Sequence, residues 1–383
     1  MNPSRARTRP RPTGLAALVV VLAVTWASVA CSADDADDAA TTSGSGGTAA
    51  TAEATTVRLL THDSFDVSDE VLEAFTAETG IRVEILRGGD AVSVVNQAIL
   101  TAGDPEADVL FGIDDNLLTA AAEAELFEPV DVDLDGVPEE LRVGPDHDVV
   151  PIDRGDVCVN YDRAGLADRG LEPPSSLAEL ADERYAGLLM VEDPSTSTPG
   201  LAFLAATVAA ERAGDLDGTW QELWEDLVDN DVVVVDGWEQ AYYGEFSGPS
   251  GEGNRPLVVS YASSPPVEVV FSADYEATGE LPDEAPTGVV EGTCIRQVEY
   301  AGVLAGTDHP EAAAALVELL LSPAFQAEVP DLMFVYPVLD GIELPEVFTR
   351  FSAVPADPYR LSPDEVGAER ADWVETWTSI VLG

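Results

Sequence analysis

Two predicted helix starts carry polar side chains that could bind a ligand. Asp90 and Ala91 lie between a predicted strand and a predicted helix, where the Asp90 carboxylate can cap the helix or pair with a cation. Ser197 and Thr198 open another predicted helix, whose free N–H groups attract polar or anionic ligand atoms. Helix capping alone would account for both motifs. The chemistry that they allow is non-covalent binding of a small polar or charged molecule.

Aromatic and hydroxyl side chains follow two further predicted strands. Trp238 can present its ring face to a cation, although a core position would suit it equally well. Tyr261 begins a turn that could form a ligand wall or an ordinary turn. The small residues of this turn are Ala262, Ser263 and Ser264. The adjacent Tyr242 and Tyr243 are a rival motif, because paired tyrosinates bind ferric iron well.

Residues for catalysis or for a resident metal are hard to find. The three histidines, His62, His147 and His309, lack metal-ligand spacing, and there is no nucleophile elbow, zinc-protease helix or phosphate-binding loop. Asp131 begins a segment similar to a calcium loop, but its twelfth position is Arg142 instead of the closing glutamate. We therefore assign no metal, no cofactor and no catalytic residue.

These motifs are positioned by an alternation of short β runs and amphipathic helical patterns. The predicted strands cover residues 57–60, 83–86, 107–111, 148–152, 156–161, 188–191, 232–235, 257–261 and 289–300. The predicted helices cover residues 68–79, 91–102, 116–124, 199–213, 220–228, 238–246, 310–321, 323–328 and 363–381. Such alternation indicates an α/β fold with mostly parallel sheets and helices on both faces.

The N-terminal segment has the features of an export signal. Four arginines precede an apolar run over 15–24, and small residues lead to Cys31. A cysteine at this point, followed by a polar tail, is typical of lipidation, so we expect residues 1–31 to be a lipoprotein signal peptide and Cys31 to carry the lipid. An ordinary cleaved signal with a chance cysteine is the alternative. Residues 32–56 have almost no large apolar side chains and are expected to be a flexible linker.

The charge balance is strongly acidic. The 383-residue chain has 72 acidic against 18 basic residues, all of them arginine, and a formal net charge of −54. Such a chain will not bind nucleic acid or an anionic membrane surface through charge. It suits a cationic ligand, although acidity spread over the whole chain is first of all typical of a solvated surface.

The two α/β series predict two lobes connected by crossing strands. We expect lobe 1 over 57–155, lobe 2 over 156–290, and a return to lobe 1 with C-terminal helices over 291–383. Cys158 and Cys294 would lie near the two crossings, and an exported protein can join such a pair in a disulfide. Two lobes behind an export signal, without a later segment long and apolar enough to span a bilayer, are typical of the substrate-binding protein of a transporter.

Several segments together resemble the periplasmic thiamine-binding proteins, which are the receptors of thiamine ABC importers. The matching segments are Thr61–Phe65, Ala107–Leu118, Ser197–Leu201, Gly237–Trp238, Ser260–Tyr261 with Ser264–Pro265, Ser322–Gln326 and Met333–Val338. The resemblance extends from residue 57 to the C-terminus. It implies the two-lobed type II periplasmic binding protein fold, with hinge-crossing strands and the ligand between the lobes.

The resemblance also implies the ligand contacts. It assigns them to Asp90, Ala91, Ser197, Thr198, Trp238, Tyr261, Ala262, Ser263 and Ser264. His62 stands where the family has a tyrosine, and Val267 lies near a family aromatic, so two walls of the aromatic cage are changed. We still expect His62 at the ligand. Its protonation would repel the positively charged thiazolium ring, which predicts weaker binding as the pH falls from about 8 to about 5.

The function expected from the sequence is that of an extracytoplasmic lipoprotein that captures thiamine or a thiamine phosphate. It would deliver this ligand to an ABC permease and its ATPase by hinge closure. It would be a monomer, held at the outer face of the cell membrane only through Cys31, with no nucleic-acid partner. One alternative is a receptor of the same fold for ferric iron, a polyamine or another organic cation. Another is an exported enzyme with a Ser or Asp nucleophile, for which no base is visible.

Overall fold

The computed structural model describes residues 55–144 and 147–383. The expected signal peptide, its Cys31 and nearly all of the expected linker lie outside the described residues. The strands are β1 (Thr55–Thr61), β2 (Ile81–Arg87), β3 (Val109–Asp114), β4 (Phe127–Glu128), β5 (Val150–Asp162), β6 (Leu189–Glu192), β7 (Val233–Val235), β8 (Leu257–Tyr261), β9 (Thr287–Leu304) and β10 (Tyr336–Pro337).

Helices alternate with these strands along most of the chain. The α-helices are α1 (Asp69–Thr79), α2 (Ala91–Leu100), α3 (Leu118–Glu123), α4 (Arg163–Asp168), α5 (Thr198–Ala213), α6 (Trp220–Asp229), α7 (Pro265–Val270), α8 (Ala273–Thr278), α9 (Pro310–Leu320), α10 (Pro323–Leu332), α11 (Glu346–Phe351) and α12 (Pro363–Val381). Short 3₁₀ turns are η1 (Glu139–Leu141), η3 (Ala178–Ala181) and η4 (Glu183–Tyr185), and η5 (Gln240–Glu245) is a π-helix.

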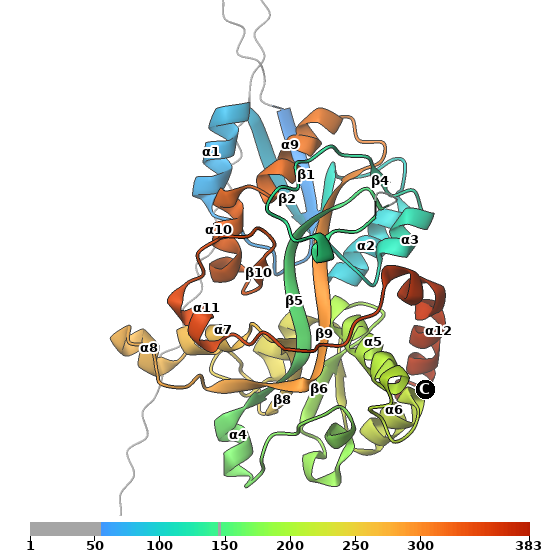
Figure 1. Ribbon diagram of the computed structural model, residues 1–383, viewed down its shortest axis with the longest axis vertical. Coiled ribbons are helices and arrows are strands. Elements are labelled where there is room, and N and C mark those ends of the chain that lie inside the picture. The colour runs from blue at the N-terminus through green and yellow to red at the C-terminus, as the bar shows by residue number, and fades with distance from the viewer. Residues whose placement is uncertain (1–54, 145–146) are drawn as a thin grey trace, which may run out of the picture. The chain divides into compact units, whose positions relative to one another are not determined.

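The strands form one mixed sheet. Its order is β2-β1-β3-β9-β5-β8-β6-β7, with β10 added to β5 and β4 added to β9. The outer pairs β1–β2, β1–β3, β6–β7 and β6–β8 are parallel, whereas β5 and β9 pair in antiparallel fashion with each other and with their neighbours. The α/β class and the crossing strands are confirmed, but the sheet is mixed rather than mostly parallel. The reason is that β5 and β9 run side by side in opposite directions through its centre (Figure 1).

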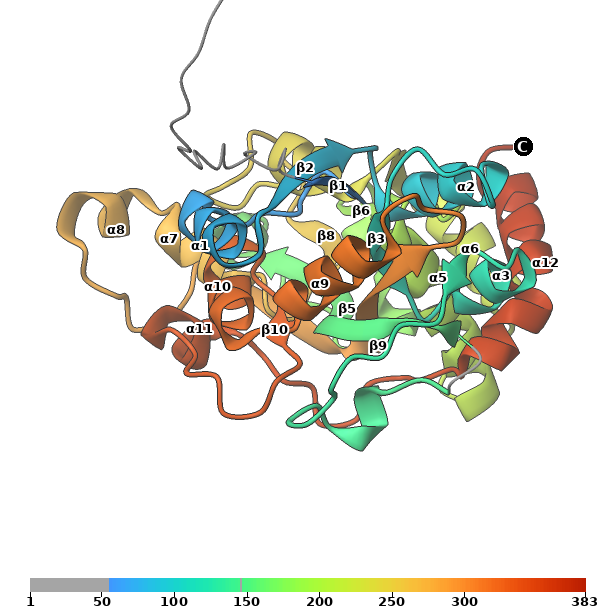
Figure 2. The same cartoon turned by 90° about the horizontal axis from the view of Figure 1, so that it is seen from above.

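Two large hydrophobic cores lie along this sheet. The first packs around β1, β3, α2 and α9, with Phe65, Phe111 and Phe325 near its centre. The second packs around β8, α5, α6 and α12, with Trp224 and Trp377 in edge-to-face contact at 5.5 Å between ring centroids. Strands β5 and β9 supply residues to both cores. Seen from above, α9 lies over the sheet beside β3 and β9, and α12 lies beside both α3 and α6 (Figure 2).

Local sequence signals explain why the helices begin and end where they do. The Ser68 hydroxyl accepts the N–H of Val71 at the start of α1, and Gly80 ends the helix with a φ of 76°. Thr219 and Glu222 form a reciprocal capping box at the start of α6. These contacts confirm the helix predicted over 68–79 and place the predicted 220–228 helix correctly.

The crossing strand β5 differs from its prediction. The sequence indicated two strands, 148–152 and 156–161, whereas the structure has one strand over Val150–Asp162. Asp153, Arg154 and Gly155 interrupt the apolar pattern, but β9 pairs with these residues and keeps the backbone extended. The segment between the strands predicted over 257–261 and 289–300, for which the sequence predicted no helix, contains α8.

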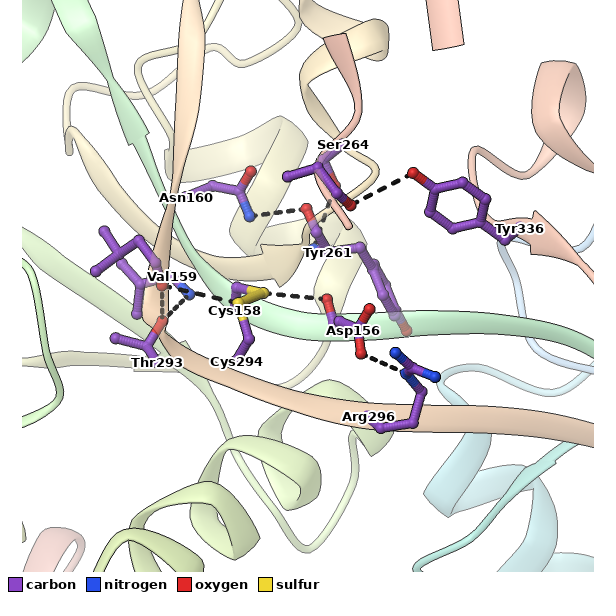
Figure 3. The surroundings of a disulfide bond; sticks show 12 residues. Asp156, Cys158, Val159, Asn160, Tyr261, Ser264, Thr293, Cys294, Arg296 and Tyr336 are labelled. Carbon is purple, nitrogen blue, oxygen red and sulfur yellow. Dashed lines mark hydrogen bonds and ion pairs between the residues drawn. A yellow bond between two sulfur atoms is a disulfide. The ribbon is translucent and has the colours of Figure 1, made fainter. Parts of the chain in front are cut away.

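A disulfide and an ion pair join the two crossing strands (Figure 3). Cys158 and Cys294 are bonded, with an S–S distance of 2.07 Å, in a small buried cluster between the strands. The Asp156 carboxylate pairs with the Arg296 guanidinium. The crossing thus holds buried polar groups between the apolar residues of the two cores.

Within the described ranges, no single helix has the length and apolar character needed to cross a membrane. The bent pair α9 and α10 meets that test only when the two helices are taken together.

Candidate ligand-binding site

A cavity of about 660 Å³ lies where segments of both cores meet. Its walls come from the segments after β1 and β2, the starts of α2 and α5, the turn before η5, the end of β8, α7, β9 and the segment before β10. It is lined by His62, Asp63, Ser64, Gly88, Gly89, Asp90, Ala91, Ser93, Thr196, Thr198, Pro199, Asp236, Gly237, Trp238, Glu239, Gln240, Tyr261, Ser264, Val267, Glu299, Met333, Phe334 and Val335. This volume suits a small organic molecule.

The cavity lining is acidic. Five of its residues carry carboxyl groups, and none is an arginine; the five are Asp63, Asp90, Asp236, Glu239 and Glu299. The whole chain has no lysine. A cleft lined by one sign of charge concentrates ligands of the opposite sign. The lining therefore favours a cationic ligand.

The Asp90 carboxylate is held by three backbone N–H groups. Its Oδ1 accepts the N–H of Ala91 at 2.7 Å and the N–H of Thr198 at 3.1 Å, and its Oδ2 accepts the N–H of Trp238 at 3.1 Å. Burial raises the pKa of Asp90, and these N–H donors oppose the rise. Asp90 is thus the N-cap of α2 and also a bridge to α5 and to the turn before η5.

Trp238 is oriented by contacts on several sides. Its indole N–H donates to Ser260 Oγ at 2.9 Å, and Ser260 Oγ lies 2.9 Å from Ser264 Oγ. The ring stacks on Tyr242 at 5.0 Å and 16° and lies 6.3 Å from the Tyr261 ring. A pre-oriented indole loses little conformational freedom when a ligand binds.

His62 lies in the cavity wall because a glycine opposite leaves room for it. Gly112, at a bulge in β3, has a φ of 100°, and a Cβ there would lie 2.4 Å from His62 Cδ2. His62 Nε2 is 3.9 Å from Glu299 Oε2. Burial lowers the pKa of His62 to about 4. The lowered pKa opposes protonation of this ring between pH 8 and pH 5, and the weaker binding expected from His62 in that range stays a prediction.

Comparison with known proteins identifies the family. Residues 70–356 match the model of the bacterial extracellular solute-binding proteins. The thiamine-binding periplasmic protein of Escherichia coli (strain K12) is 32% identical over 327 residues, which are 84% of this chain and 92% of that protein. The chain is a bacterial extracellular solute-binding protein, from the group of the thiamine-binding periplasmic proteins. The solved structure of a periplasmic thiamin binding protein matches with a TM-score of 0.71 and 29% identity, over 85% of this chain and 96% of that one.

An iron protein is a more distant relative of this solute-binding protein. Iron uptake protein A1 of Synechocystis is 26% identical over 319 residues, which are 82% of this chain and 84% of that protein.

The adjacent Tyr242 and Tyr243 were the sequence motif that suggested ferric iron as an alternative ligand. Tyr242 is fully buried, its hydroxyl donates to the Ser264 carbonyl, and burial raises its pKa well above the usual range. Tyr243 also lies outside the cavity lining, and burial raises its pKa to about 12. This pair is thus poorly suited to binding iron.

Most of the residues predicted for the site of this solute-binding protein line the cavity. They are His62, Asp90, Ala91, Thr198, Trp238, Tyr261 and Ser264. Ser197, Ala262 and Ser263 are fully buried and lie outside the lining. Ser197 precedes α5, and the other two follow β8 in the turn that places Ser264. Val267, the position near a family aromatic, also lines the cavity.

The calcium-like segment has no metal cluster. In the described part of the chain, no group of three or more His, Cys, Asp or Glu side chains is arranged to hold a metal ion. The Arg142 guanidinium instead donates to the carbonyls of Leu134 and Val137 at 2.8 and 2.6 Å. These two carbonyl oxygens therefore accept hydrogen bonds from an arginine of the same segment.

Glu299 and Phe334 are among the cavity residues that sequence reasoning missed. Glu299 lies inside β9, and the signal for it was an acidic residue within a long apolar strand. Phe334 has a φ of 54°, a backbone conformation that is uncommon for an aromatic residue and is concentrated at ligand sites. Its segment was matched as part of the family resemblance, but nothing local indicated that the ring reaches the cavity.

Proposed function

We propose that this protein captures thiamine outside the cytoplasm and delivers it to an ABC permease. The observation that carries the proposal is a cavity lined by five carboxyl groups and by the Trp238, Tyr261 and Phe334 rings, without an arginine. Thiamine combines a permanent positive charge with two flat rings. Carboxylates attract the charge, and aromatic faces bind both the rings and the cation. The names of the relatives point to the same ligand.

Calorimetric titration of the mature protein with thiamine tests the proposal. Thiamine monophosphate and diphosphate, ferric citrate and spermidine are titrated beside it. We expect heat and saturation with thiamine, and neither colour nor heat with ferric iron. If no thiamine form gives a heat of binding and ferric iron gives a coloured complex, the protein is an iron receptor and the proposal is wrong.

We also propose that the protein binds its ligand without turning it over. Its family consists of solute-binding proteins, and sequence reasoning found no nucleophile with a base. Thiamine should be recovered unchanged, by chromatography, after long incubation with the protein. Appearance of the separated pyrimidine and thiazole halves would show catalysis and contradict this part of the proposal.

The anchoring proposal concerns Cys31. Lipid on this cysteine would hold the protein at the outer face of the membrane as a monomer, with the linker leaving the binding domain free to meet the permease. Metabolic labelling with a fatty acid should mark the protein, and Cys31→Ser should abolish the label. A labelled Cys31→Ser variant would contradict the assignment. Sedimentation should show a monomer at all concentrations.

A further inference from the structure

Glu299 is a buried carboxyl group in the cavity lining that no donor satisfies. Only 8% of the residue is exposed, and the described residues give its side chain no hydrogen bond. Its carboxyl oxygen Oε2 lies 3.9 Å from His62 Nε2, and burial lowers the pKa of that imidazole to about 4. His62 Nε2 is itself buried without a hydrogen-bond partner. Glu299 and His62 thus bring two polar groups that accept no hydrogen bond from an N–H donor to the cavity wall.

The sheet register places a carboxyl group on each side of Glu299. Asp114 of β3 and Asp153 of β5 are its direct neighbours across the two strand pairs, and both are fully buried. Asp114 accepts hydrogen bonds from Asn116 and Gln297. Neither Asp153 oxygen receives a hydrogen bond from another described residue. Asp153 and Glu299 can satisfy each other only by sharing a proton.

The other groups that face Glu299 do not supply a positive charge. Besides the two neighbouring aspartates they are His62 after β1, Asp90 at the start of α2 and Tyr261 of β8. No described arginine forms an ion pair with Glu299, and Arg296 of the same strand pairs with Asp156. Burial, and then the charge of Asp153, raise the pKa of Glu299 well above its usual range. Asp153 and Glu299 are thus two buried carboxyl groups in direct register, and no described arginine pairs with Glu299, so one proton shared between them would remove their mutual repulsion.

We propose that Glu299 is the counter-charge for the ligand's positively charged ring and that cation binding displaces the proton shared by Glu299 and Asp153. This inference rests on the proposed function and names the group that sets its specificity. The balance is simple: the neutral acid loses one proton to solvent, and the resulting carboxylate pairs with the incoming cation. Asp153 is the positioning residue that holds the proton. Affinity for a cation then rises with pH, by up to about tenfold per pH unit while the pair is protonated.

Calorimetry in two buffers of different ionisation heat measures this proton. The wild-type protein should release about one proton per thiamine near neutral pH. Glu299→Gln should bind thiamine at least about tenfold more weakly, because a charge pair is lost in a partly desolvated cavity, and it should release no proton. The uncharged probe is a thiamine analogue with a thiophene in place of the thiazolium. It should bind both proteins alike.

Control variants separate charge from folding. Glu318→Gln, on the exposed side of α9, makes the same change in net charge and should leave affinity and proton release as in the wild type. Asp153→Asn should shift the pH dependence of thiamine binding to lower pH, because an amide N–H can donate to the ionised Glu299. Circular dichroism establishes that each variant is folded.

The possible outcomes distinguish this inference from the function on which it rests. A wild-type protein that does not bind thiamine contradicts the proposed function itself. A wild-type protein that binds thiamine, with Glu299→Gln binding equally tightly and releasing the same proton, overturns only the role of Glu299. If Glu299→Gln does not fold, an unchanged pH dependence in Asp153→Asn overturns the inference instead.

Discussion

Asp90 Oδ2 lies 3.1 Å from the backbone nitrogen of Trp238, which is 148 positions later in the chain. The other oxygen of the same carboxylate accepts the first N–H of α5. Asp90 caps α2, which packs in the first core, whereas α5 packs mainly in the second. One side chain therefore links the two sides of the cavity.

Replacing Asp90 with Asn should loosen this link. The amide offers one acceptor oxygen to three N–H donors, and hydrogen bonds to charged groups are worth about 1.5–3 kcal/mol each. The amides of Thr198 and Trp238 should exchange with deuterium at least about tenfold faster, and thiamine should bind more weakly. Thr101→Ala, at the other end of α2 and outside the cavity lining, is the control, since it removes only hydroxyl hydrogen bonds to the carbonyls of Gln97 and Ala98. Unchanged exchange in Asp90→Asn would show that the carboxylate does not hold the segments together.

Removing the Trp238 ring should weaken thiamine binding. A desolvated cation–π contact is worth about 2 kcal/mol, so Trp238→Ala should lose roughly thirtyfold in affinity by calorimetry. Ser260→Ala keeps the Trp238 ring but removes the acceptor of its indole N–H, and should weaken the binding free energy of thiamine by about 1 kcal/mol. Equal affinities for the wild type and Trp238→Ala would place the cation elsewhere in the cavity.

The free energy of unfolding should depend on Asp114 in a specific pH window. Burial raises the pKa of Asp114 from 3.8 to about 7. The native protein therefore holds a proton that the unfolded chain releases near pH 4. The protonated Asp114 therefore contributes to the free energy of unfolding. Its contribution is fully present below about pH 4 and is lost as the pH rises to about 7. Urea unfolding at several pH values should show the loss in the wild type, and the difference between wild type and Asp114→Asn should change across this window. A constant difference would contradict the raised pKa.

The disulfide should contribute measurably to stability. Removing a native disulfide from a small secreted domain costs about 2–5 kcal/mol, and we expect this for Cys158→Ala with Cys294→Ala. Guanidinium unfolding of the oxidised wild type and of the double variant measures the cost. The wild type in reductant should behave like the double variant. An unchanged unfolding midpoint would show that pairing of β5 with β9 suffices.

Trp377 should be essential for the second core. It is fully buried against Trp224, and Trp377→Ala should lower the free energy of unfolding by about 3–5 kcal/mol. Leu100→Ala is the matched surface control, because Leu100 is 87% exposed and should cost less than about 0.5 kcal/mol. Thermal unfolding compares the two variants. Similar melting temperatures would mean that α12 is dispensable for the core.

Local signals were enough to predict much of this fold. Ser68 and Gly80 mark both ends of α1, and the apolar spacing from Trp220 to Leu227 marks α6. Aromatic and acidic residues at the ends of strands identified several cavity walls, including Asp90 and Trp238. Each of these features depends on neighbours within a few positions in the chain.

The remaining features depend on contacts between distant segments. The pairing of Glu299 with Asp153 requires the register of β9 against β5, which no short stretch of sequence contains. The lowered pKa of His62 depends on how deeply the ring is buried, not on its neighbours in the chain. The mixed character of the sheet likewise depends on the directions in which β5 and β9 cross it.

The bond between Cys158 and Cys294 spans 136 positions and closes that part of the chain into a covalent ring. The ring contains β6, β7, β8, α5 and α6, which build most of the second core. A single proteolytic cut anywhere between the two cysteines therefore opens the ring without releasing a fragment. The two pieces of a protein cut in this way would stay covalently joined until a reductant reached a bond that lies buried between two strands.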